Sequence, residues 1–192
     1  NDTRTPIFTD SKNHAKLKIC LESLNSDTQI QSLLNPEGLL EQPIIGNEIA
    51  FLIDVLVEAP EHKPFILKIK SKLDNYSIDK EEGIITVNDL KTTGDLINNF
   101  AKGALIDYHY YREMALYSWL LTMAAKKNYN IENPKIRSNF LVVETIPNFN
   151  TKVVPMTREL FNKGFKEFTY LLKLVAFYCM HGYEGFGITQ ET

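Results

Sequence analysis

Cysteine is scarce in this sequence, with Cys20 and Cys179 as the only two among 192 residues. They lie far apart and form no Cys-x-x-Cys pair, which argues against a structural zinc site or a disulfide framework. A reducing, cytoplasmic setting fits this usage best.

A basic excess is also missing, because 24 acidic residues outweigh 21 Lys and Arg and leave a formal net charge of −3. No overall positive field therefore indicates nucleic acid, although an enzyme needs only a local basic groove. No apolar run approaches the length of a membrane span and no signal peptide is visible, so we predict no membrane partner. The chain begins at Asn1 rather than at Met, which leaves room for an upstream segment.

The composition that is present, 44% hydrophobic and 23% charged, is typical of a globular protein. We predict one domain over residues 1–192, of the mixed α/β class, with a central mixed β-sheet that contains an antiparallel meander and is flanked by helices. The patterns predict helices over 10–34, a loop over 35–46, strands at 49–59, 64–78 and 83–91, a helical region over 95–127 interrupted at Gly103, strands at 137–146 and 150–156, and a last helix from a Thr157 cap to Gly182.

The second predicted strand alternates lysines with apolar residues in the stretch FILKIKSKLD. Successive strand side chains point to opposite faces. An acid therefore follows a row of lysines on one face, formed by Lys68, Lys70, Lys72 and Asp74. The solvated face of an edge strand, where lysines deter aggregation, is the structural explanation of this row.

The third predicted strand, within ITVNDLKTTG, carries two opposite charges where it ends. Ile85, Val87, Asp89 and Lys91 share one face, so the strand starts in the core and finishes with an acid and a lysine. Buried charges are costly unless they pair or bind a metal. The sequence leaves open whether this pair is a structural ion pair or part of a site in front of the sheet.

Asp74 on the preceding strand supplies a second acid for such a site. Two carboxylates and a carbonyl oxygen are hard ligands that suit Mg²⁺ or Mn²⁺. The metal polarises a phosphodiester and lowers the pKa of bound water from about 15.7 toward neutrality. A nearby lysine orients or deprotonates the attacking water, or offsets charge that builds on the phosphate. The combination Asp…Asp-x-Lys is therefore a minimal set of groups for a phosphodiesterase.

The segments SKLDNYSI and ITVNDLKTTG, followed by YHYYREMALY, resemble the PD-(D/E)XK nuclease superfamily. Within it, the chain is most similar to the RecE-like and λ-exonuclease-like phage recombination nucleases. Members place an acid after a basic strand, the motif D-[LVI]-K-T-T at the end of a neighbouring strand, and Q-x-x-x-Y on a following helix. The resemblance covers residues 41–186 and implies a restriction-endonuclease-like core.

By this resemblance, the catalytic residues are Asp74, Asp89 and Lys91. Asp74 and Asp89 would bind the metal through their side chains, and Leu90 would bind it through its backbone carbonyl. Many members add an upstream glutamate as a ligand. Glu41 is the candidate for that role and Glu48 is the runner-up.

The helix motif departs from the family, because Glu113 stands where Gln is expected, four residues before Tyr117. Residues four apart share one helix face. The glutamate can therefore join the metal ligands or hydrogen-bond the lysine, but it would repel a phosphate.

Several other residues have both a DNA-binding and a structural interpretation. Thr92 and Thr93 lie near the scissile phosphate in the family, and ordinary strand-end threonines are the equal alternative. Arg112 suits a phosphate clamp, and Lys72 with its lysine row suits a DNA-tracking face. Aromatic residues of the same helical region could stack on DNA ends, although helix packing is the commoner role of Tyr108, Tyr110, Tyr111 and Tyr117.

The resemblance implies an enzyme, a Mg²⁺-dependent (or Mn²⁺-dependent) deoxyribonuclease that hydrolyses phosphodiester bonds. The expected activity is 5′→3′ exonuclease action on double-stranded DNA ends in phage or prophage recombination. The implied partners are DNA, a single-strand annealing protein and further copies of the chain in a ring of three or four, in the cytoplasm of a bacterium or an infected host. The alternatives are an endonuclease of the same superfamily and a non-catalytic module that binds nucleic acid or protein.

Overall fold

The computed structural model describes residues 11–36, 43–59 and 62–182. Its sheet has five strands in the order β1-β2-β3-β4-β5, in which β3 and β4 are parallel and every other neighbouring pair is antiparallel. This arrangement confirms the predicted mixed sheet with an antiparallel meander. The elements are α1 (Ser11–Ser26), α2 (Thr28–Leu34), β1 (Ile44–Ala59), β2 (His62–Asp79), β3 (Ile84–Thr93), η1 (Ile97–Asn99), α3 (Ala104–Asp107), α4 (Tyr110–Tyr129), β4 (Lys135–Glu144), β5 (Thr151–Pro155) and α5 (Arg158–His181).

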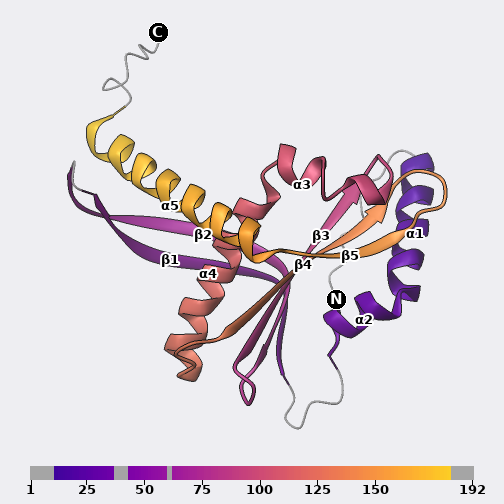
Figure 1. The fold of residues 1–192 in the computed structure, drawn as a ribbon, viewed down its shortest axis with the longest axis horizontal. Helices are drawn as coiled ribbons and strands as arrows, with labels where there is room; N and C mark the ends of the chain where they lie inside the picture. The colour runs from indigo at the N-terminus through magenta and orange to yellow at the C-terminus, as the bar shows by residue number, and fades with distance from the viewer. Residues whose placement is uncertain (1–10, 37–42, 60–61, 183–192) are drawn as a thin grey trace, which may run out of the picture.

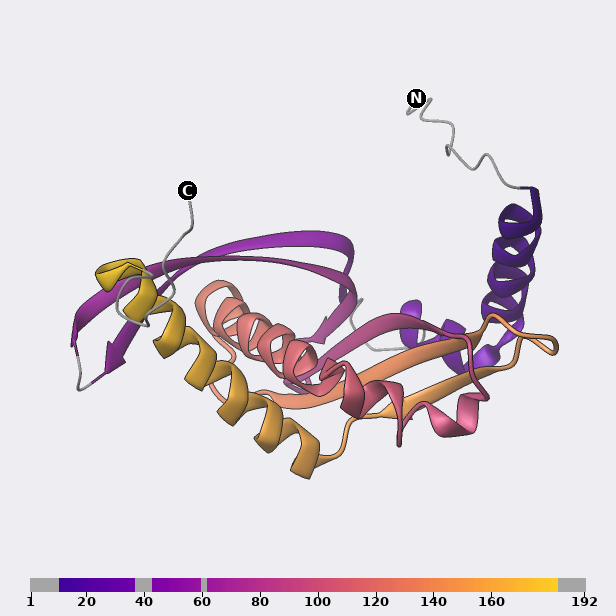
Figure 2. The ribbon, with the colours of Figure 1, turned by 90° about the horizontal axis from the view of Figure 1, so that it is seen from above.

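Helices cover both faces of the sheet, as Figures 1 and 2 show. On one face α4 packs on the main core, to which β4 contributes Phe140 and Val142. On the other face α1 and α2 pack on a smaller core, to which the same strand contributes Leu141 and Val143. The alternation of β4 thus divides its apolar side chains between two helical layers, as expected for a strand that is buried on both faces.

The long connection from β3 to β4 places α4 beside the end of β3. Parallel neighbours cannot be joined by a tight turn and need a crossover, usually through a helix. Here η1, α3 and α4 form that crossover, and the side chains of α4 reach the charged end of β3 as a result.

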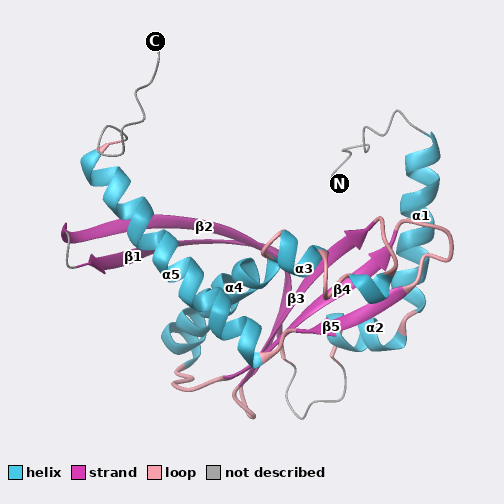
Figure 3. Cartoon of the chain, turned by 45° about the horizontal axis from the view of Figure 1, so that its top comes forward, coloured by secondary structure: helices cyan, strands magenta, loops and turns pink. Residues whose placement is uncertain are grey.

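The β1–β2 hairpin extends well beyond the rest of the sheet (Figure 1). β2 pairs with β3 only from Asn75–Asn88 to Asp79–Ile84, whereas its pairing with β1 continues nearly to the tip of the hairpin. α5 covers one face of this extension, where Leu172 and Ala176 join a third small apolar cluster. Figure 3 shows α4 and α5 beside the hairpin, and α1 and α2 near β5.

The helical region predicted over 95–127 is divided in the structure. Gly103 precedes α3, as expected for a break at that position. A second break follows at His109, which has a left-handed backbone conformation with φ of 55° immediately before α4. Histidine is among the non-glycine residues found more often in that region, but no feature of the sequence indicated it here.

The loop was predicted to extend to residue 46, which is wrong, because β1 already begins at Ile44. Gly46 gave this stretch a loop-like appearance. In the structure it is a strand residue whose missing side chain leaves room for the ring of Tyr76, which a Cβ would strike. The glycine therefore serves a close approach between neighbouring strands rather than a turn.

The last helix matches its predicted limits. Thr157 caps α5 by accepting a hydrogen bond from the Leu160 N–H, and Gly182 follows its end with a φ of 70°. Gly164 lets α5 approach α4, because a Cβ there would strike the Tyr111 carbonyl. None of the helices within the described part of the chain is long and apolar enough to span a bilayer.

Candidate active site

The site begins where β2 and β3 separate. Their last paired residues are Asn75 and Asn88. Asp74 and Asp89 are the next residue on each strand, and they face the gap. At this point the backbone N–H of Leu90 donates a hydrogen bond of 2.9 Å to a side-chain oxygen of β2, Oδ2 of Asp74, rather than to a backbone carbonyl. The departure of β2 thus brings two acids and the Leu90 main chain to one point.

Asp89 is the most deeply buried group of the site, with only 4% of the residue exposed. Its Oδ2 lies 2.7 Å from the Nζ of Lys91, with which it forms an ion pair. Burial raises the pKa of Asp89 to about 7, and the charges of Glu113 and Asp74 act in the same direction, against Lys91. An ionised Asp89 therefore lacks enough positive charge around it.

Lys91 lies between two acids. Its Nζ donates to Oε2 of Glu113 over 3.2 Å, contacts Asp89, and lies 4.5 Å from the ring centre of Tyr110. Burial by itself would lower the pKa of Lys91, but its interactions with Asp89 and Glu113 outweigh burial and raise that pKa. The lysine is therefore held as a cation, which suits charge stabilisation better than proton abstraction.

Glu113 connects the lysine to the helix. Its other oxygen, Oε1, accepts a hydrogen bond of 2.6 Å from the hydroxyl of Tyr117, one turn later on α4. Burial raises the pKa of Tyr117 and the carboxylate of Glu113 raises it further, so the hydroxyl stays protonated as a donor. This glutamate, at the position where the sequence resemblance led us to expect Gln, therefore orients Lys91 and offsets its charge.

The arrangement fits a divalent metal by the chemistry of its ligands. Burial raises the pKa of Asp89 although Lys91 lies 2.7 Å away, so a divalent cation beside this carboxylate would favour its charged form. Asp74 lies across the gap, and the Leu90 carbonyl is expected to face it too, because N–H and C=O of one strand residue point to the same neighbour.

Two carboxylates and a carbonyl suffice for Mg²⁺, which usually keeps several waters. Among the described residues, no group of three or more His, Cys, Asp or Glu side chains could hold a metal. Glu41, the predicted third ligand, lies outside the described residues.

The runner-up ligand, Glu48, is engaged elsewhere. It forms an ion pair with Lys72 on the outer surface of the hairpin, and its own φ is 54°. Lys72 therefore has an acidic partner, although its side chain is 59% exposed and remains accessible from solvent.

The two threonines of the motif lie on opposite faces of β3. Thr92 is exposed, but alternation places it on the face opposite to Lys91. Thr93 shares the face of Lys91 and is buried, and its hydroxyl accepts a hydrogen bond from the Asp95 N–H over 3.2 Å. This geometry offers no support for their predicted DNA contacts, which stay predictions.

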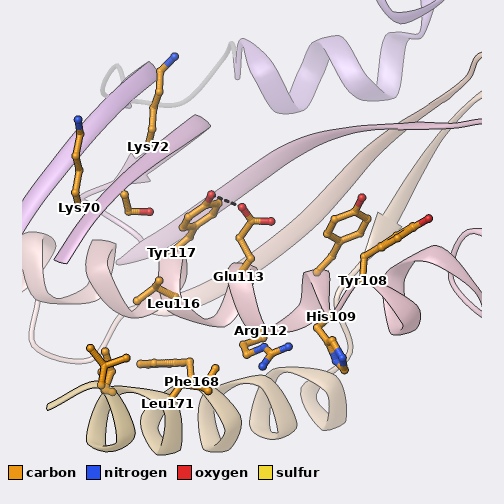
Figure 4. Close-up of a pocket in the computed structure, with 14 residues that line it drawn as sticks. Lys70, Lys72, Tyr108, His109, Arg112, Glu113, Leu116, Tyr117, Phe168 and Leu171 are labelled. Atoms are coloured by element: carbon orange, nitrogen blue, oxygen red, sulfur yellow. Dashed lines mark hydrogen bonds between the residues drawn. The ribbon is translucent and has the colours of Figure 1, made fainter. Parts of the chain in front are cut away.

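Beside the acids and lysine lies a groove of about 670 Å³ between β2, α4 and α5 (Figure 4). Arg112 lines it and lies 3.9 Å from Glu167 on α5, a loose ion pair. Of the four tyrosines in the sequence cluster, Tyr111 and Tyr117 are buried, Tyr110 is half-buried and Tyr108 is exposed.

A row of asparagines behind the site was not foreseen. They lie at directly opposed positions of four adjacent strands, and each donates to the next over 2.7–3.0 Å: Asn139 to Asn88, Asn88 to Asn75, and Asn75 to Asn47. Asn88 and Asn75 also donate to the carbonyls of Leu33 and Leu34 at the end of α2. An asparagine next to each acid, in LDN and VND, was the available signal.

Three of these amides, Asn75, Asn88 and Asn139, are buried, and their hydrogen bonds favour the observed pairing of β2 with β3. A slip of one residue would move every side chain to the other face, and would leave several buried polar groups without partners. The asparagine row therefore helps to place Asp74 opposite Asp89.

Comparison with known proteins finds a likeness of structure. No protein-family model and no curated protein sequence matches the chain. Among solved structures, it is similar to a protein from Eubacterium rectale described as a "Putative exonuclease", with a TM-score of 0.59 and 12% identity. The match covers 87% of this chain and 53% of that one, so the chain corresponds to about half of its neighbour's length. At such low identity the likeness concerns architecture: the chain shares the mixed α/β fold of this neighbour.

Proposed function

We propose that this protein is a metal-dependent deoxyribonuclease. The observation that carries the proposal is Asp89, a buried carboxylate placed between Lys91 and Asp74 where two strands separate. A purely structural ion pair would not need the second acid or the opening beside it. The nuclease-like fold gives independent support.

Each side chain has a role in phosphodiester hydrolysis. A divalent metal bound here would polarise the phosphate and supply a water of lowered pKa as the nucleophile. Asp74 and Asp89 would hold that metal through carboxylate oxygens. Lys91, kept cationic by its acidic neighbours, would offset the charge that develops on the phosphate. Glu113 and Tyr117 would fix the position of the lysine.

We further propose, from the sequence resemblance, a Mg²⁺- or Mn²⁺-dependent 5′→3′ exonuclease that acts on double-stranded DNA ends in phage or prophage recombination. A single-strand annealing protein and further copies of the chain in a ring are the proposed partners, in the bacterial cytoplasm. The support for these finer points is the DLKTT motif with its upstream acid and its downstream helix.

The test is cleavage of linear double-stranded DNA labelled at the 5′ or the 3′ end, with Mg²⁺ and with EDTA, and with covalently closed circles as a control. The proposal expects Mg²⁺-dependent loss of linear DNA from 5′ ends with the circles spared. Asp89→Asn should abolish cleavage, whereas Asp54→Asn, which changes an exposed acid on the hairpin, should not.

Other results would change the proposal in defined ways. Nicked or linearised circles would indicate an endonuclease of the same fold. A folded protein that cleaves no DNA with either Mg²⁺ or Mn²⁺ would contradict the enzyme and leave a non-catalytic binding module. Equal activity of wild type and Asp89→Asn would remove Asp89 from the site.

A further inference from the structure

The groove beside Lys91 has walls of contrasting chemistry. Lys70 and Lys72 stand on β2, while Tyr108 stands beyond Glu113 on the other side, at the start of α4 (Figure 4). Arg112 adds a further cation between α4 and α5. The lining that α5 contributes is apolar and consists of Phe168, Leu171, Leu172 and Val175.

Tyr108 is the most informative residue of this groove, because 69% of it is exposed. Its ring lies 5.6 Å from that of Tyr110, which packs on Phe100 at 6.1 Å and lies under Lys91. An aromatic series therefore leads from the opening of the groove to the catalytic lysine. Only its outermost ring has a face free for a ligand.

The backbone around Tyr108 is held in place. The left-handed turn at His109 separates Tyr108 from the buried ring of Tyr111. The His109 Nδ1 and the Tyr111 hydroxyl lie 2.9 Å apart, and that hydroxyl donates to Glu167 on α5 over 3.0 Å. Unusual backbone conformations persist only where the surroundings fix them. Here the fixed turn keeps an exposed aromatic ring beside the site.

We infer that this groove receives an unpaired, single-stranded segment of DNA next to the bond that is cut, with a base stacked on Tyr108. The inference rests on the proposed nuclease function and specifies its substrate. A duplex turns phosphates and sugars outward, which would leave the exposed ring and the apolar wall without a partner. An unpaired base offers a flat apolar face to an aromatic side chain.

Charge and size agree with this occupant. Arg112 has only the loose pairing with Glu167, so it can contact a phosphate in the groove. Lys70 adds positive charge at the rim, where its side chain extends away from α4 and α5 (Figure 4). Both oxygens of Glu113 already accept hydrogen bonds, which offsets its repulsion of a phosphate. A volume of about 670 Å³ is in the range of pockets for small ligands rather than that of a surface for a whole duplex.

The test measures binding in EDTA, where no cleavage occurs, by fluorescence anisotropy with a short labelled single strand and with a blunt duplex of the same sequence. Tyr108→Ala should weaken single-strand binding about tenfold, in the range measured for loss of one stacking contact, and should change duplex binding little. Tyr108→Trp should restore binding. Tyr170→Ala is the matched control, because Tyr170 is 65% exposed on α5 and does not line the groove.

The possible results separate this inference from the nuclease proposal. Equal single-strand affinity of Tyr108→Ala and Tyr170→Ala would overturn the groove assignment, even if the wild type cleaves DNA. Tyr108-dependent single-strand binding by a protein that cleaves nothing would support the groove and contradict the enzyme. A fluorescent 2-aminopurine in the strand adds a direct readout, because stacking on Tyr108 should quench it in the wild type and not in Tyr108→Ala.

Discussion

Two acid–lysine pairs in the sheet have the same chemistry and opposite surroundings. Asp54 and Lys68 lie opposite each other on the outer face of the β1–β2 hairpin, 3.0 Å apart, with 59% and 72% of their side chains exposed. Asp89 and Lys91 lie 2.7 Å apart on one strand, with 5% and 16% exposed. The first pair is solvated, whereas the second is enclosed under α4.

The difference indicates which pair is a candidate for function. An exposed pair has little effect on stability, because water screens both charges. A buried pair must offset the cost of leaving water, and Asp89 does so only in part, since burial raises its pKa to about 7. The buried pair of Asp89 and Lys91 therefore costs folding free energy and lies beside a groove. Both features are typical of functional sites. The following predictions test this contrast.

The largest effect is expected from Lys91→Ala. Removal of the cation should lower the rate of Mg²⁺-dependent cleavage by on the order of 10²–10³, with far-UV circular dichroism unchanged. Steady-state kinetics on linear DNA would measure it, with Asp54→Asn as the control. If Lys91→Ala keeps wild-type activity, the two pairs do not differ in function.

The pH dependence of stability should also separate the pairs. Because burial raises the pKa of Asp89 from 3.8 to about 7, the folded chain holds a proton between these pH values that the unfolded chain has released. In EDTA, the contribution of Asp89 to the free energy of unfolding should therefore fall as the pH rises from about 4 to about 7, by on the order of 2–4 kcal/mol.

Asp89→Asn removes this titration. The variant should be more stable than the wild type at pH 8, and the gain should shrink toward pH 4, as urea unfolding in EDTA would show. Asp54→Asn should not produce such a trend. A constant difference between wild type and Asp89→Asn across this range would argue against a strained carboxylate.

Glu113→Gln should have an intermediate effect. The amide can still accept a hydrogen bond from Tyr117 but cannot pair with the charge of Lys91, to which Glu113 lies 3.2 Å away. We expect cleavage to fall about tenfold, the size of one charge-assisted hydrogen bond. Measurement of kcat and KM would locate the loss. An increase in activity would show that Gln serves Lys91 better and that Glu113 is not an orienting partner.

The smallest effect belongs to the exposed pair. The coupling between Asp54 and Lys68, from unfolding free energies of Asp54→Asn, Lys68→Ala and the double variant, should stay below about 1 kcal/mol. It should weaken further in high salt. Strong coupling that persists in high salt would mean that the hairpin pair stabilises the fold, contrary to this comparison.

The secondary structure and the face on which each charge lies followed largely from local pattern. Alternation along ITVNDLK was enough to predict that Asp89 and Lys91 share a face, and Thr157 and Gly182 marked the ends of α5. The left-handed turn at His109 could not be predicted, because the Tyr111 hydroxyl that His109 contacts is itself held by Glu167 on the distant helix α5. The early start of β1 was missed because Gly46 suggested a loop, whereas in the structure its missing side chain leaves room for the ring of Tyr76.

The sequence by itself determined the mixed α/β class, the strand that carries Asp89 and Lys91 out of the core, and the helix face shared by Glu113 and Tyr117. These features depend on residues a few positions apart. Only the tertiary structure decided that β2 leaves β3 directly after the asparagine row, that Asp74 then bonds to Leu90, and that Tyr108 rather than Tyr111 faces the groove. Each of these depends on packing between segments distant in the chain, which local periodicity does not encode.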